Sequence, residues 1–427
     1  MTAAPVAFSP GAEWAEDQDR ADPLAWTRGE FHLPAGPDGR PLVYLSGNSL
    51  GLMPRSAPGM VDAELEDWGR LGVEGHLEAR SPWYSYHELF REPLARLVGT
   101  GPDEVVAMNS LTVNLHLLMV SFFRPTPERH RILIEDGAFP SDRYAVASHL
   151  QSRGLDPAES LVAVRPRTGE QTLRTEDVEE LLATRGEGIA LVLLSGVQYA
   201  TGQLFDLERI TRAAHRAGSV ACFDLAHAVG NVELALHDWE VDCAAWCSYK
   251  YLNAGPGAIA GCFVHRKHGA NPDLPRYAGW WGNDPASRFR MQENTGFVPV
   301  SGADGWQLSN PPILSMAPLR ASLALFDRVG MRALREKSAR LTGYLEYLVD
   351  AAAPGLELLT PRAPGARGAQ LSYRIPGRGR DVLNALRARG VVTDLREPDV
   401  IRLAPAPLYN TFGDVWRAAR ALAEAVR

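Results

Sequence analysis

The residue of this sequence that most clearly suggests chemistry is a lysine in an apolar and aromatic stretch. Lys250 lies within residues 246–255, and upstream the apolar run at 223–227 carries Asp224. A lysine in desolvated surroundings has a reactive amine, which can hold an aldehyde cofactor as a Schiff base. Pyridoxal phosphate is such an aldehyde, and it also needs a carboxylate that pairs with its protonated ring nitrogen. Lys250 and Asp224 supply both groups if the strands before them end at one cleft.

Both residues also have ordinary explanations. Most lysines are solvated, and an aspartate after a strand often caps a turn or a helix. The glycine-rich residues 255–261 superficially resemble a dinucleotide-binding sequence, but the spacing differs and a strand should follow rather than a helix. We therefore reject a nicotinamide site and interpret these glycines as allowing the backbone to pass close to the lysine and its cofactor.

Two further segments suit the same cofactor. Polar side chains in residues 109–116 precede an apolar helical run at 115–123, so a phosphate would meet a helix N-terminus. Simple capping of that helix explains the polar residues equally well. Phe139 has a flat ring that can cover the cofactor ring, and the alternative is an ordinary core aromatic.

The composition is that of an ordinary globular protein. The chain has 427 residues, of which 45% are hydrophobic and 22% charged, which is enough for a core and about two or three domains. The net charge of -7 gives no support for a nucleic-acid or anionic-membrane surface. Residues 1–20 do not resemble a secretory signal, and no run approaches the about 18 apolar residues of a membrane helix. We expect a cytoplasmic protein without a nucleic-acid or membrane partner.

The cysteines cluster in the central apolar region, as Cys222, Cys243, Cys247 and Cys262. This distribution is typical of reduced cysteines rather than of a disulfide framework. Cys243 and Cys247 are four residues apart and could form a metal site with His227 or His265. We prefer to interpret them as small buried hydrophobic residues, and we expect no metal.

The middle of the chain alternates between strand-like and helix-like segments. Short apolar strands are expected at residues 131–135, 161–165, 190–194, 220–224 and 258–265. Asp206 should cap a helix at 207–217, and the alternation predicts a mostly parallel α/β sheet. In such sheets ligands bind beyond the carboxyl ends of the strands, where residues 135–142, residues 195–198 and Asp224 should converge.

The C-terminal part has a different pattern, which predicts a smaller α+β domain. A long helix at 317–350, which Gly330 can interrupt, leads to a Pro- and Gly-rich loop at 354–368. Strands are expected at 370–375 and 391–403, and helices at 381–389 and 411–427. We expect an N-terminal segment (1–60) that contributes to the small domain and the site entrance, a large cofactor-binding domain (61–316) and the small domain (317–427).

Several segments, read in order, resemble the kynureninase family. They are residues 44–51, 111–116, 139–142, 195–199, 224–231, 247–253, 309–312 and 402–410. The resemblance spans about residues 40–425, and it implies a fold-type-I pyridoxal-phosphate enzyme with a mostly parallel, seven-stranded type of sheet and a smaller α+β domain. It further implies a homodimer that hydrolyses the Cβ–Cγ bond of kynurenine or 3-hydroxykynurenine. The products are alanine and anthranilate or 3-hydroxyanthranilate, in tryptophan catabolism and in NAD or secondary-metabolite biosynthesis.

The resemblance also implies roles for individual residues. Lys250 carries the Schiff base, Asp224 pairs with the pyridinium nitrogen, and Tyr249 relays protons. Further cofactor contacts are implied at Leu111, Thr112, Phe139, Asp142, Ser195, His227 and Tyr249, and across the dimer interface at Trp280 and Asn310. Substrate contacts are implied at Arg402, Ser49, His76 and Asn310. Arg402 matches the arginine that binds the α-carboxylate, which a planar guanidinium suits better than an ammonium group.

His76 and Asn310 also predict a preference between the two substrates. The resemblance is to the branch of the family that favours 3-hydroxykynurenine, and both side chains can form hydrogen bonds with a ring hydroxyl. The alternatives to this function are another fold-type-I enzyme, such as a class-V aminotransferase, and a catalytically silent binding protein. A cysteine desulfurase is disfavoured because the last cysteine, Cys262, lies only twelve residues beyond Lys250 and within an expected strand.

Overall fold

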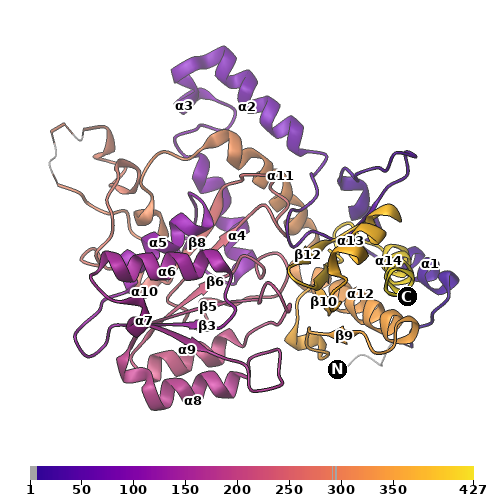
Figure 1. Cartoon of the computed structure of the whole chain (residues 1–427). Coiled ribbons are helices and arrows are strands. Elements are labelled where there is room, and N and C mark those ends of the chain that lie inside the picture. Colours follow the sequence, from indigo (N-terminus) through magenta and orange to yellow (C-terminus); the bar gives the residue numbers. More distant parts are fainter. Residues whose placement is uncertain (1–6, 291, 294–295) are drawn as a thin grey trace.

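The computed structural model describes residues 7–290, 292–293 and 296–427, and a seven-stranded sheet forms the larger part of the molecule (Figure 1). The strands lie in the order β2 (Val105–Ala107), β8 (Ala260–Val264), β7 (Cys243–Cys247), β6 (Val220–Asp224), β5 (Ile189–Ser195), β3 (Arg131–Glu135) and β4 (Leu161–Val164). β3 to β7 are parallel, and β8 is antiparallel to both of its neighbours. The mostly parallel sheet predicted from the sequence is therefore confirmed.

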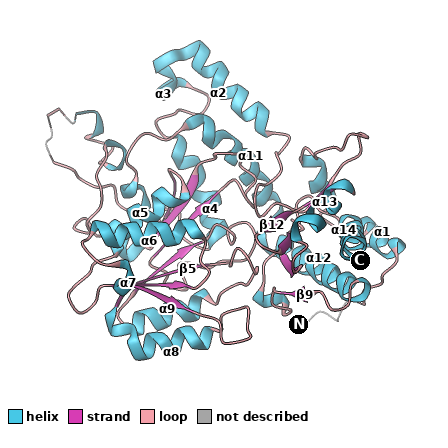
Figure 2. Cartoon of the chain, viewed as in Figure 1, coloured by secondary structure: helices cyan, strands magenta, loops and turns pink. Residues whose placement is uncertain are grey.

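Helices cover both faces of this sheet, as Figure 2 shows. Leu191 and Leu193 of β5 face a core formed with α5 (Leu111–Phe122) and α6 (Pro140–Ser152). Val192 and Leu194 face the opposite core, which includes α8 (Thr175–Arg185), α9 (Leu207–Arg216) and α4 (Arg91–Val98). Because both faces are buried, the strands are continuously apolar rather than alternating.

A second, smaller sheet is antiparallel and lies beside the carboxyl ends of the large one (Figure 1). Its order is β12 (Asp394–Arg396), β13 (Val400–Leu403), β10 (Leu371–Arg374) and β9 (Glu357–Leu358). Its core includes α12 (Met331–Ala352), α13 (Gly379–Ala388) and α14 (Phe412–Val426). The N-terminal part of the chain joins this unit, since α1 (Ala12–Arg20) packs on α14 and β1 (Val43–Tyr44) pairs with β11 (Val391–Val392).

A helical arm stands out from the body above the large sheet. It consists of α2 (Ala57–Leu71) and α3 (Gly75–Glu78), and α2 packs against α11 (Ile313–Val329) at its base (Figure 1). Trp68, Val73 and Leu77 on this arm are exposed. Among the helices that the structure describes, none combines the length and the apolar character needed to cross a bilayer.

Several element boundaries differ from those expected. The strand expected at 391–403 is wrong, because the chain turns back after β12 and forms β12 and β13 as an antiparallel pair. Gly330, at φ +81°, separates α11 from α12. The strand expected before Lys250 had no predicted bounds, and β7 is that strand. α5 begins at Leu111 rather than at residue 115. The division at residues 60 and 316 stays a prediction, and residues 1–6 of its first part lie outside the described residues.

Candidate active site

The carboxyl ends of three neighbouring strands bring polar side chains together. Glu135 ends β3, Ser195 ends β5 and Asp224 ends β6, and Ser195 lies opposite Asp224 in the strand register. The Ser195 hydroxyl donates to the Glu135 carboxylate, and the Asp224 carboxylate accepts the Ala226 N–H at 2.7 Å. Parallel pairing thus places residues from distant parts of the sequence at one edge, as expected for an α/β sheet.

Lys250 reaches the same edge from the bend that follows β7. Its Nζ lies 5.8 Å from the ring centre of Phe139 and 5.8 Å from that of Tyr249. The backbone before it is held by Gly51, whose N–H donates to the Tyr249 carbonyl at 2.8 Å. A Cβ at Gly51 would lie 2.3 Å from the Lys250 carbonyl oxygen, so only glycine fits there. The close approach to the lysine is made by this glycine, whereas Gly255 has open space around it.

A cavity of about 160 Å³ lies between these residues. Nine of the residues expected to contact the cofactor line it, namely Leu111, Thr112, Phe139, Asp142, Ser195, Asp224, His227, Tyr249 and Lys250. The sequence interpretation did not single out Ser110, Ser141, Val197, Tyr199 and Ala226, which line it too. Ser110, Ser141 and Val197 lie within segments that were expected at this edge, and Ala226 adjoins His227. Tyr199 lies four residues beyond Ser195, past the segment 195–198 that was expected there.

Burial dominates the ionisation of the polar groups in this cavity. Burial, and next the adjacent Asp224 carboxylate, raises the pKa of Asp142 well above its ordinary value. Burial, followed by the charges of Lys250, Arg402 and then Arg396, lowers the pKa of His227 well below its ordinary value. His227 is therefore neutral at neutral pH, and Asp142 gives up its proton less readily than an ordinary carboxyl group.

Tyr249 has the properties of a proton donor. Burial, and then the neighbouring Cys247, raises the pKa of its phenol, so the hydroxyl stays protonated at neutral pH. Glu135 is fully buried, and burial raises its pKa although the hydrogen bond from Ser195 opposes the change. Glu135 holds Ser195 at the cavity and does not itself line it.

Several groups at the site fit an aldehyde cofactor with an anionic phosphate. The His227 Nδ1 and Asp142 Oδ1 atoms are buried and lack a hydrogen-bond partner among the described residues. The N-terminus of α5 opens onto the cavity at Ser110, Leu111 and Thr112, and the first N–H groups of a helix have no partner within it. An amine, an aromatic face, a carboxylate and an anion-binding helix end thus lie around one small cavity.

Arg402 lies beyond the cavity wall rather than in it. Its side chain is 0% exposed, and its Nε donates to Asp394 at 2.7 Å while its Nη1 donates to the Tyr199 carbonyl at 2.7 Å. Its Nη2 also donates to Asp394 and, at 3.2 Å, to the Ser49 hydroxyl. Ser49 and Arg402, both expected to contact the substrate, are therefore adjacent, with Asp394 between them and Tyr199 toward the cavity.

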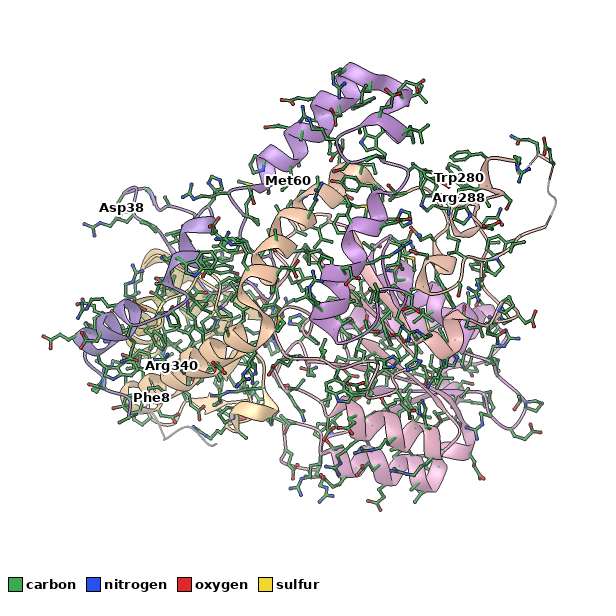
Figure 3. The ribbon with its side chains drawn as sticks, turned by 180° about the vertical axis from the view of Figure 1, so that it is seen from behind. Phe8, Asp38, Met60, Trp280, Arg288 and Arg340 are labelled. Carbon is green, nitrogen blue, oxygen red and sulfur yellow. The ribbon has the colours of Figure 1, made fainter. Side chains whose placement is uncertain are left out.

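The remaining predicted residues lie at a different place on the same chain. His76 and Asn310 line one cavity of about 510 Å³ between the helical arm and the N-terminal end of α11, together with Trp83 and Trp281. Trp280 adjoins this region, with its ring centre 4.8 Å from that of Trp281 (Figure 3). His76 and Asn310 are thus brought together, but neither they nor Trp280 line the Lys250 cavity.

The cysteines do not form the metal site that their spacing allowed. All four are free and buried, and the acidic and histidine group that comes closest to a metal site, within the described ranges, is Glu104 with His237 and His265. The two imidazole rings are stacked at 4.9 Å with 10° between their planes. Lone pairs in parallel rings do not point at one ion, so we interpret this group as a hydrogen-bonded cluster around the buried Glu104 carboxylate.

Comparisons with known proteins agree with this geometry. The family model of the kynureninase C-terminal domain matches residues 334–422. Proteins named kynureninase from Myxococcus xanthus and Salinispora tropica are 55% and 58% identical, with 98% and 96% of this chain and of theirs covered. A solved structure of C-DES with glycine linked to its PLP cofactor has a TM-score of 0.76 at 19% identity, covering 92% of this chain and 98% of that one. The cysteine desulfurase CsdA from Escherichia coli has a TM-score of 0.75 at 18% identity, covering 94% and 98%.

Proposed function

The chain belongs to the kynureninase family, and we propose that it hydrolyses the Cβ–Cγ bond of kynurenine or 3-hydroxykynurenine. The products would be L-alanine and anthranilate or its 3-hydroxy form, which implies a role in tryptophan catabolism, with NAD or secondary-metabolite synthesis as branches. We also propose a cytoplasmic location. One observation supports the proposed reaction most. Lys250, Asp224 and Phe139 converge on one cavity in a chain that resembles named kynureninases over nearly its whole length.

Pyridoxal phosphate is the cofactor that suits the groups around the cavity. Lys250 would hold it covalently, Asp224 would pair with its ring nitrogen, and Phe139 would cover one ring face. The N-terminus of α5 with Thr112 would bind its phosphate. When bound, this cofactor supplies an electron sink for negative charge that develops on the substrate.

The chain's own residues would move the protons. The Lys250 amine, when it is not holding the cofactor, would take up and return the α-proton of the substrate. Water adds to the γ-carbonyl of the substrate, and the aryl group leaves Cβ as the aryl carboxylic acid. The Tyr249 phenol, which stays protonated because burial raises its pKa, can donate the proton that Cβ then takes up. His227, held neutral by burial, adds no competing positive charge beside Lys250.

We propose that the α-carboxylate of the substrate binds at the Ser49 and Arg402 side of the cavity. Arg402 matches the family position for this role, and its guanidinium is fixed by Asp394 and by the Tyr199 carbonyl. The amino-acid end would then lie between Lys250 and the small sheet. The aryl end would point away from that sheet.

We also propose a homodimer in which the partner completes the aryl end of each site. Trp280, Asn310 and His76 lie around the second cavity rather than around Lys250, so they can contribute to catalysis only if a neighbouring subunit brings them there. If His76 and Asn310 form hydrogen bonds with the 3-hydroxyl of the substrate ring, kynurenine, which lacks this hydroxyl, leaves them unpaired. Its binding in the transition state would then be weaker by about 1–3 kcal/mol. Measurement of kcat/KM for both substrates tests this preference, which equal values would contradict.

Incubation with kynurenine and 3-hydroxykynurenine, with product fluorescence as the readout, tests the proposed reaction. Release of anthranilate or 3-hydroxyanthranilate together with alanine is expected. Formation of a keto acid without C–C cleavage would instead indicate an aminotransferase. A colourless protein that takes up no pyridoxal phosphate would indicate a silent homologue. Desulfurase chemistry is disfavoured because all four cysteines are buried and Cys262 lies within β8.

A further inference from the structure

The hairpin formed by β12 and β13 presents three charged side chains on one face. Asp394 pairs directly with Arg402 in the antiparallel register, and Arg396 lies two residues along the same strand as Asp394. Because side chains alternate between the two faces of a strand, Asp394 and Arg396 share the face to which Arg402 belongs. This face meets the Tyr199 side of the Lys250 cavity, since Arg402 donates to the Tyr199 carbonyl.

The donors of Arg402 are almost completely occupied. Its Nε, Nη1 and Nη2 atoms all donate to Asp394, to the Tyr199 carbonyl or to the Ser49 hydroxyl, and its side chain is 0% exposed. A guanidinium group carries five N–H donors, so about one is left for a substrate. Arg402 by itself therefore offers an incoming carboxylate a fixed positive charge, but few free hydrogen-bond donors.

Arg396 has the opposite properties. Its side chain is 36% exposed, and both hydrogen bonds that it forms come from Nη2, at 3.2 Å to Asp394 and 3.4 Å to Ser49. Its Nε is buried and lacks a hydrogen-bond partner within the part of the chain that the structure describes. Its guanidinium carbon lies 5.8 Å from the ring centre of Tyr199, and that ring meets Phe139 edge-on at 5.2 Å within the cavity wall.

The charges on this face match a single carboxylate. Arg396 and Arg402 carry two positive charges and Asp394 one negative charge. Burial is the largest influence on the pKa of Asp394 and raises it, but the hydrogen bonds from Arg402 and Ser49 and the charges of both arginines together lower it. Two positive charges and one negative charge leave one positive charge uncompensated within this group. An amino acid brings one carboxylate, which would neutralise it in a partly buried place where charge-assisted hydrogen bonds are strong.

We propose that Arg396 is a second carboxylate-binding residue, which uses its open guanidinium donors to hold the α-carboxylate of the substrate beside the fixed Arg402. This inference rests on the proposed function for the identity of the substrate as an amino acid. Arg402, clamped by Asp394, sets the position of the charge, and Arg396 supplies the hydrogen bonds. Within the cavity the carboxylate would then lie on the Tyr199 side.

The test compares Arg396→Gln and Arg396→Lys with wild type and with Arg374→Gln, all as holoenzymes. Arg374 is the matched control because it lies in the same small sheet and pairs with Glu357 instead. Titration with L-alanine, which carries the α-carboxylate without the aryl ketone, gives a dissociation constant that does not depend on turnover. Kinetics with kynurenine give KM and kcat separately.

For Arg396→Gln we expect L-alanine affinity and KM to weaken by about tenfold or more, with kcat changed less and cofactor affinity unchanged. Arg396→Lys keeps the positive charge but lacks the planar guanidinium group, so its L-alanine affinity and KM should lie between those of wild type and Arg396→Gln. Arg374→Gln should match wild type. If Arg396 had only a structural role, its substitution would lower the unfolding temperature, but L-alanine binding would not weaken from wild type through Arg396→Lys to Arg396→Gln. Arg396→Gln with wild-type L-alanine affinity and KM would overturn the inference, as would a wild-type holoenzyme that does not bind L-alanine.

The two proposals fail in different ways. A wild-type enzyme that binds L-alanine but does not cleave kynurenine contradicts the proposed reaction, while the L-alanine titrations still decide the role of Arg396. Cleavage of kynurenine with unchanged KM in Arg396→Gln contradicts only the role of Arg396.

Discussion

Replacing Asp394 by asparagine tests how the protein holds Arg402 in place. The Asp394 carboxylate accepts hydrogen bonds from Nε and Nη2 of Arg402 and, at 2.7 Å, from the Ser49 hydroxyl. Asparagine has nearly the same shape, but it lacks the negative charge and replaces one acceptor with an amide NH2. That NH2 would face the donors of Arg402, so the buried guanidinium would lose its counterion and at least one hydrogen bond.

The expected loss follows from the burial of this pair. The Arg402 side chain is 0% exposed and that of Asp394 is 20% exposed. Removing one partner of a buried ion pair costs about 3–5 kcal/mol, and the remaining exposure of Asp394 favours the lower end, about 3 kcal/mol. Asp350→Asn is the matched control, because Asp350 pairs with Arg362 on the surface at 45% and 59% exposure. We expect that change to cost less than about 1 kcal/mol.

The dependence of this loss on pH has a definite sign. Although burial opposes it, the hydrogen bond from Arg402 lowers the pKa of Asp394 in the folded protein. A lowered pKa adds stability above the pKa of the unfolded state, about 3.9, and this stability is lost as the pH falls through the folded value. The difference between wild type and Asp394→Asn should therefore be constant from about pH 5.5 to 8 and should shrink below about pH 4.

Urea unfolding followed by tryptophan fluorescence, on wild type, Asp394→Asn and Asp350→Asn, measures these differences. The reasoning is refuted if Asp394→Asn is no less stable than Asp350→Asn at pH 7. It is also refuted if the gap to wild type widens on acidification, because that would mean the Asp394 carboxylate is not the stabilising form.

Three further predictions concern the cofactor, the assembly and the large sheet. Borohydride reduction and peptide mapping should label Lys250, and Lys250→Ala should lose the absorption of bound cofactor and nearly all turnover; a label on another lysine would contradict the assignment. Sedimentation should show a dimer at assay concentration, and mixing Lys250→Ala with Trp280→Ala subunits should restore part of the activity, whereas an active monomer would rule out composite sites. Asp242 is buried and accepts hydrogen bonds from His215 and His268 at 2.7 Å each. The substitution Asp242→Asn should therefore lower the free energy of unfolding by about 3–5 kcal/mol. The KM of that variant should stay unchanged, and an unaltered unfolding temperature would argue against the role.

The residues at the strand ends could be predicted because a parallel sheet imposes their position. Asp224 and Ser195 each end an apolar run, and once these runs pair in parallel their last residues must meet at one edge. Lys250 follows from the same rule, since it comes just after β7. For these residues a local pattern and one rule of topology were enough.

The group around Arg402, proposed to bind the carboxylate, could not be predicted from strand patterns; Arg402 and Ser49 were expected only from the resemblance. Residues 391–403 look like one long strand, and within one strand Asp394 and Arg402 would have no reason to meet. They form a pair only because the chain reverses between β12 and β13, so that antiparallel pairing places them opposite each other. For Arg396 the sequence shows only that it lies two residues after Asp394. Solvated charges on a protein surface often have the same spacing, so this alone does not indicate a binding residue.

The site depends on how the two sheets are held together, because each of them supplies a different part of it. Lys250 and Asp224 belong to the large sheet, and the arginines of the carboxylate end belong to the small one. Buried side chains tie the two, since Asn231 donates to the His227 carbonyl at 2.8 Å and accepts the Ala369 N–H at 2.8 Å. The distance between Lys250 and the arginines proposed to bind the carboxylate therefore depends on hydrogen bonds in the interior. A substrate that must present its amine and its carboxylate together is best recognised by such a fixed spacing, because near-attack geometry tolerates little displacement.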